Sequence, residues 1–166
     1  MILWIEMGIP ARALELEQFS VGATGEALLG SAYELLRDQW RTGDRDRELG
    51  LHLMFLAWYL VIEPPSLTGL DEKRVPSVEL PAMFSEVHDY FSNSIKGDVE
   101  LLYVVGLMAH LCSWCIGDYG LWENRSKEYR AAYRRLAPDG ILPSVFEKRG
   151  YYGHYFAGHA RISNGY

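Results

Sequence analysis

Two stretches of the chain are apolar at nearly every position, and each follows a Gly-Asp pair. The first is Leu49–Ile62, after Gly43-Asp44, and the second is Leu101–Ile116, after Gly97-Asp98. A helix that is apolar all round is normally buried, and an aspartate just before such a run is a common N-cap. The pattern therefore predicts two buried central helices in an all-α helical bundle.

Segments with helical spacing of apolar positions surround these two runs. We expect one helix over Ala11–Phe19, and a second that follows the loop 21–25 and runs to about Trp40. A further helix begins at Pro81, another runs from Asp118 to about Ala137, and a short one lies within Ser144–Ser163. Either Asp44 or Asp46 caps the first central helix, and Thr24 is a candidate cap of the helix before it. Residues 1–9 form a short strand or an ordered arm. The length of 166 residues suits one domain, so we predict a single all-α domain (1–166) of six or seven helices.

The chain also shows an internal similarity. Leu53-Met54 and Leu107-Met108 are 54 residues apart, and the two Gly-Asp pairs have the same offset. This indicates an outer helix, a turn and an inner helix, built twice as αα-hairpins. Residues 99–138 resemble tetratricopeptide-type helical hairpins through a short set of positions: Leu102, Gly106, Tyr129, Ala132 and Pro138. The resemblance implies stacked hairpins whose concave face can bind a partner.

Charge and hydropathy exclude several classes of protein. The net charge is −6, with −9 over residues 1–100 and +3 over residues 101–166. Nucleic-acid binding needs a basic footprint, so it is not expected. The apolar runs are shorter than the roughly 20 residues of a membrane span, and neither a signal peptide nor a framework of disulfides is indicated. We expect a cytoplasmic protein. Its acidic surface either attracts a basic partner or simply keeps the protein soluble.

The two cysteines form the pair Cys112-x-x-Cys115. In redox proteins this motif begins a helix, where the helix dipole lowers the thiol pKa. Here it lies near the end of an apolar run, which favours inert core cysteines. Together with His154 and His159 the pair also has the residue types of a zinc site, although 38 residues separate the two pairs. No cofactor is predicted.

Three further groups of residues are candidates for binding. The basic stripe Lys127, Arg130 and Arg134 either contacts an anionic partner or is a solvated face. The tail carries Tyr151, Tyr152, His154, Tyr155 and Phe156, which either dock on the core or form a recognition patch. His52 and His110 interrupt the apolar runs, and they are either core residues or face a shared pocket.

No sequence motif of a known catalytic site stands out. The sequence therefore favours a non-enzymatic protein-binding module, either an adaptor or a small acidic inhibitor of the immunity-protein kind. The residues 64–80, with three prolines and no helical period, are one candidate contact surface. The alternative is a small enzyme or ligand-binding protein with a site between the central helices, zinc- or thiol-dependent through Cys112, Cys115 and a histidine. The apolar surplus is also compatible with a homodimer.

Overall fold

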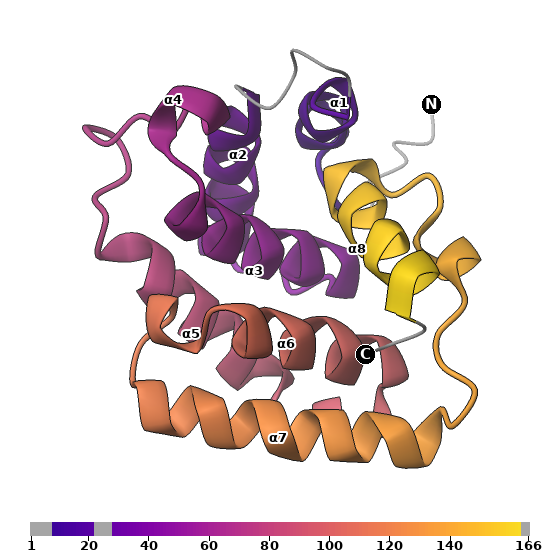
Figure 1. Cartoon of the computed structure of the whole chain (residues 1–166). Helices are drawn as coiled ribbons and strands as arrows, with labels where there is room; N and C mark the ends of the chain where they lie inside the picture. The colour runs from indigo at the N-terminus through magenta and orange to yellow at the C-terminus, as the bar shows by residue number, and fades with distance from the viewer. Residues whose placement is uncertain (1–7, 22–27, 164–166) are drawn as a thin grey trace.

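All regular secondary structure in the computed structural model is helical over the residues that it describes, 8–21 and 28–163 (Figure 1). The helices are α1 Ala11–Phe19, α2 Leu29–Arg41, α3 Arg47–Ile62, α4 Pro65–Thr68, α5 Glu79–Phe91, α6 Val99–Leu111, α7 Tyr119–Leu136 and α8 Gly150–Ser163. Between them lie the 3-10 turns η2 Ile95–Gly97, η3 Ser113–Cys115 and η4 Pro143–Phe146. The all-α prediction is confirmed, and the additional helix is the four-residue α4. Thr24 and residues 1–7 lie outside the described residues.

Helix α3 is the first predicted central helix. Asp46, rather than Asp44, is its cap, because Asp46 accepts a hydrogen bond of 3.1 Å from the backbone N–H of Leu49. Every residue from Leu49 to Leu60 is buried, since α2 and α5 both pack on this helix. The helix ends at Ile62, just before two prolines that cannot continue it.

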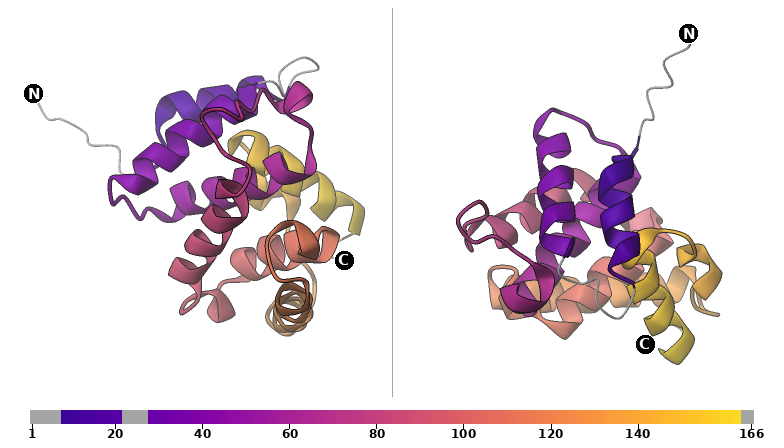
Figure 2. Two further views of the ribbon diagram at one scale, coloured as in Figure 1. Left: turned by 90° about the vertical axis from the view of Figure 1, so that its left-hand side faces the viewer. Right: turned by 90° about the horizontal axis from the view of Figure 1, so that it is seen from above.

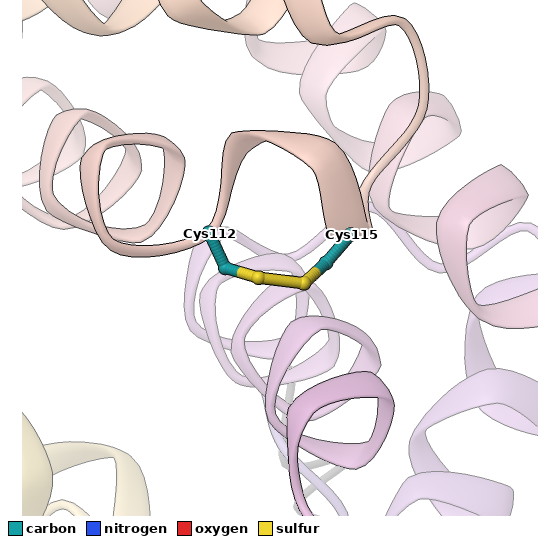
Figure 3. Close-up of a disulfide and its surroundings, with 2 residues drawn as sticks. All are labelled: Cys112 and Cys115. Atoms are coloured by element: carbon teal, nitrogen blue, oxygen red, sulfur yellow. A yellow bond between two sulfur atoms is a disulfide. The ribbon is translucent and has the colours of Figure 1, made fainter.

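Helix α6 is the second central helix, capped by Asp98 and buried from Leu101 to Ala109. It ends at Leu111, so the expectation of a helix up to Ile116 was wrong. The backbone leaves helical geometry at Cys112, where φ is −153° and ψ is 70°. A disulfide between Cys112 and Cys115 closes the η3 turn that follows (Figure 3).

The hairpins pair differently from the predicted repeat. Helix α2 packs on α3 as expected, but α5 also packs mainly on α3, while α6 packs along α7. Because α6 and α7 span most of residues 99–138, the segment with tetratricopeptide resemblance does form a helical hairpin. Its Asp118 caps α7, as predicted, by accepting from the backbone N–H of Leu121 at 2.7 Å.

The arrangement of the helices places α3 and α6 in the middle. In Figure 1, α7 runs along one edge, α1, α2 and α4 lie at the opposite edge, and α8 lies beside α1; Figure 2 gives two further views. Within the described ranges, no helix combines the length and the hydropathy needed to cross a lipid bilayer.

Candidate binding groove and the charge cluster beneath it

A cluster of charged side chains lies inside the molecule, centred on His52 of α3. The imidazole Nδ1 lies 2.7 Å from Oε2 of Glu17 on α1, and Nε2 lies 2.9 Å from Oε1 of Glu48. His52 and Glu17 have no exposed surface. Burial lowers the pKa of His52, but the charges and hydrogen bonds of the two carboxylates outweigh it and raise the pKa to about 9. The ring is therefore a cation that donates from both nitrogens.

Arg149, which precedes α8, extends this cluster. Its Nε and Nη2 donate to the two oxygens of Glu48 at 2.8 and 2.6 Å, and its Nη1 lies 2.6 Å from Oε1 of Glu100. Burial alone would raise the pKa of Glu48, but the hydrogen bonds from His52 and Arg149 lower it to about 2. Such a bidentate arginine–carboxylate pair is among the stronger polar contacts in proteins.

Glu17 ties α1 to the beginning of α8 as well. Its Oε1 accepts from the backbone N–H of Tyr152 at 3.2 Å, where a carboxylate is favoured by the helix dipole. The Tyr152 hydroxyl in turn donates to Glu100 at 2.7 Å. One buried network therefore joins α1, α3, α6 and α8.

The backbone around Arg149 is unusual. Lys148 has φ of 58° and Gly150 has φ of 65°, both in the left-handed region. Glycine accepts this conformation freely, whereas for a lysine it costs about 1 kcal/mol. A Cβ atom at position 150 would lie 2.9 Å from Oε1 of Glu17. This turn, with glycine at the position of closest approach, directs Arg149 into the cluster.

A groove of about 1070 Å³ lies over the cluster, between α1 and α8. Glu48 and Arg149 reach it from the buried network. Its remaining wall combines apolar and charged residues, among them Leu14, Glu15 and Gln18 of α1, Phe146 of η4, and His154, Ala157 and Arg161 of α8. A large concave surface beside ionisable groups of shifted pKa is the first candidate for a binding site.

The protein is expected to lose stability as the pH rises from about 6.5 to about 9. His52 has a pKa of about 9 in the folded protein and 6.5 as an ordinary histidine, so the folded state holds the proton more tightly. Its contribution is complete below pH 6.5 and is lost as the pH passes the folded value. Urea unfolding at a series of pH values should show this decline in the wild type and a flatter profile in His52→Gln.

Glu48 gives the opposite sign at low pH. Its pKa falls from 4.5 to about 2 on folding, so its contribution to stability is present above pH 4.5 and is lost as the pH drops to 2.

For His52, parallel stability profiles of the wild type and His52→Gln between pH 6.5 and 9 would contradict a charged imidazole.

The predicted basic stripe lies on α7, away from the groove. Lys127 is exposed and pairs with Glu123 at 3.3 Å, and Arg134 is exposed. Arg130 is half-buried, with Nη1 3.0 Å from Nδ1 of His110. His110 is exposed at the end of α6, while His52 is buried among carboxylates. The hypothesis that both histidines face one pocket is therefore wrong.

The aromatic tail forms the first turns of α8 and docks on the core. Tyr151 and Tyr152 are buried, Tyr155 is half-buried, and the hydroxyls of Tyr151 and Tyr59 lie 3.0 Å apart. Of the two alternatives for the tail, docking on the core rather than an exposed recognition patch describes these tyrosine rings. His154 differs, because it is exposed and lines the groove.

The proposed zinc ligands do not form a metal site in this structure. Cys112 and Cys115 are buried, as expected, but they are bonded to each other, and zinc binds free thiolates. His159 is half-buried, with its ring 4.7 Å from that of Tyr155. Over residues 8–21 and 28–163, no group of three or more His, Cys, Asp and Glu side chains is placed to hold a metal ion.

Sequence reasoning missed the main residues of the cluster. Glu17, Glu48 and Arg149 look like ordinary surface charges in the sequence, and only the spacing of Glu48 and His52, four residues apart on one helix, could have indicated a pair. Glu17 and Tyr152 are 135 residues apart. No local pattern reports such a contact.

Comparison with known proteins identifies no relative of this chain. No protein-family model, no curated protein and no solved structure matches this chain. The likeness to tetratricopeptide hairpins is therefore a local resemblance, and the arguments on function rest on the fold and its surfaces.

Proposed function

We propose that this chain is a non-enzymatic protein-binding module, an adaptor or a small acidic inhibitor of the immunity-protein kind. The observation that carries the proposal is the groove between α1 and α8, where apolar side chains such as Leu14 and Ala157 are flanked by charges of both signs. Partner segments commonly bind between two helices in this way, with an apolar face inward and charges at the rim.

The state of the charge cluster supports binding over catalysis. A general base needs access to the proton that it removes. His52 is buried and both of its ring nitrogens are engaged, while both oxygens of Glu48 are held by Arg149. These groups join α1, α3, α6 and α8 beneath the groove. The alternative, an enzyme or ligand-binding protein with its site between the central helices, has less support because His52 is engaged by two carboxylates and His110 is exposed at the end of α6.

The expected partner is a basic protein. Residues 1–100 carry a net charge of −9, and such an excess accelerates association with an oppositely charged surface. Binding that is steered in this way weakens as salt rises. A second copy of the chain is the other candidate partner.

The cytoplasm is the location proposed from the sequence. The bond between Cys112 and Cys115 weighs against it, because disulfides are uncommon in cytosolic proteins. Mass spectrometry of protein alkylated at lysis, without reductant, shows which state the cell maintains.

Affinity capture with groove variants tests the proposal. Leu14→Glu adds a charge to the apolar wall, and Leu35→Glu on α2, 36% exposed in the wild type, is the matched control outside the groove. The wild type and Leu35→Glu should retain one stoichiometric partner at low salt and lose it at high salt. Leu14→Glu should retain about tenfold less, as for a truncated contact worth about 1.4 kcal/mol.

Two results would argue against this function. One is recovery of the bait alone under all salt conditions. The other is equal capture by Leu14→Glu and the wild type, which would remove the groove as the contact surface. Circular dichroism of both variants checks that they keep the helical fold.

A further inference from the structure

A second, smaller groove lies where α3 ends and the long connection begins. It has a volume of about 330 Å³, at the lower end of the roughly 300–1,000 Å³ of ligand pockets. Leu60, Leu70 and Leu80 are among its apolar walls, and Glu63 and Glu72 also line it. None of the described residues that line it is basic. In Figures 1 and 2 this connection, from α4 to α5, lies at the edge of the molecule.

The two carboxylates of this groove, those of Glu63 and Glu72, form no ion pair within residues 8–21 and 28–163. Among the nearby cations, Arg74 lies 2.6 Å from Glu34, and Arg37 and Arg41 both contact Glu79. Lys73, which follows Glu72 in the sequence, is exposed and does not line the groove. The groove therefore combines apolar walls with two carboxylates that no ion pair of the described residues engages.

Tight backbone contacts hold the walls in place. Helix α4 packs on α2, and a Cβ atom at Gly30 would lie only 2.6 Å from the carbonyl oxygen of Gly69. Gly69 itself has φ of 71°, a left-handed conformation that suits glycine. Val75, further along the connection, is fully buried. A preformed site loses less free energy to ordering when it binds.

We infer that this groove is a recognition pocket for a basic side chain of the partner protein, above all an arginine. The methylene groups would lie on the leucines, and the guanidinium would lie between Glu63 and Glu72. Arginine suits such a site because its head is weakly hydrated and its stem is apolar. The inference rests on the proposed function, since it names the partner's chemistry, but it is testable without the partner.

The test is an NMR titration of the ¹⁵N-labelled full chain with N-acetyl-arginine methylamide. Saturable shift changes are expected at residues 60–63, 70–72 and 80. N-acetyl-citrulline methylamide has nearly the same shape without the charge, and it should leave these signals unchanged. The variant Glu63→Gln/Glu72→Gln should bind the arginine probe about fivefold more weakly, the effect of losing exposed ion pairs.

Glu128→Gln/Asp139→Asn is the matched control, because it removes the same charge from two exposed carboxylates that line neither this pocket nor the α1–α8 groove. It should bind the probe like the wild type. Equal binding of citrulline and arginine, or unchanged binding by Glu63→Gln/Glu72→Gln, would overturn the inference. Neither result touches the proposed function, which the capture experiment tests through Leu14.

Discussion

Replacing His52 with leucine is expected to lower the free energy of unfolding by about 3–5 kcal/mol, the usual cost of removing one partner from a buried ion pair. The substitution leaves the Glu17 carboxylate, which has no exposed surface, with only the backbone N–H of Tyr152 among its described partners. Urea unfolding at pH 6 measures the change, since His52 is charged there in the folded wild type.

A second substitution isolates the electrostatic part of this effect. In His52→Leu/Glu17→Gln the remaining side chain is neutral and still accepts from Tyr152, so about 2 kcal/mol should return. Arg12→Ala is the control for an exposed pair. Arg12 and Glu15 have side chains 67% and 63% exposed, so its loss should change stability by less than about 0.5 kcal/mol. A cost of under 1 kcal/mol for His52→Leu would contradict a structural role for the cluster.

Gly153→Ala is expected to cost about 3 kcal/mol of stability or to prevent folding. A Cβ atom at this position would meet the carbonyl oxygen of Phe146 in η4, and it would lie 2.9 Å from Cβ of Arg149. Backbone atoms cannot swing away as the end of a side chain can. The same helix offers a matched control in Gly158, where an added Cβ meets no atom within 4 Å.

Gly158→Ala should therefore raise the melting temperature, because alanine favours a helix over glycine by about 1 kcal/mol. Thermal unfolding followed by circular dichroism compares the two variants directly. Equal melting temperatures would mean that α8 does not pack on η4 as described.

The two grooves lie at opposite ends of α3. The larger groove lies between α1 and α8, and the smaller one lies at the C-terminal end of α3. A partner that contacts both would need to span α3. A partner that fills only one would leave the other free, as an adaptor requires. Measuring capture by Leu14→Glu and by Glu63→Gln/Glu72→Gln against the same partner separates these cases.

The sequence by itself determined the central helices and where they begin, except that it left Asp44 and Asp46 as alternative caps of the first one. Asp46, Asp98 and Asp118 each cap the helix that they precede, because a cap and its helix are neighbours along the chain. The burial of α3 and α6 followed from runs of apolar residues for the same reason. The end of α6 was misjudged, because apolar residues continue past Leu111 while the backbone turns at Cys112.

Only the tertiary structure decided which charges are buried and where the grooves lie. Glu48 meets Arg149 across 101 residues, and Glu17 meets His52 across 35. These pairs depend on how α1, α3 and α8 dock, and docking depends on the summed packing of many side chains rather than on a local signal. The grooves are likewise spaces between segments distant in the chain, so their walls exist only once the helices have packed together.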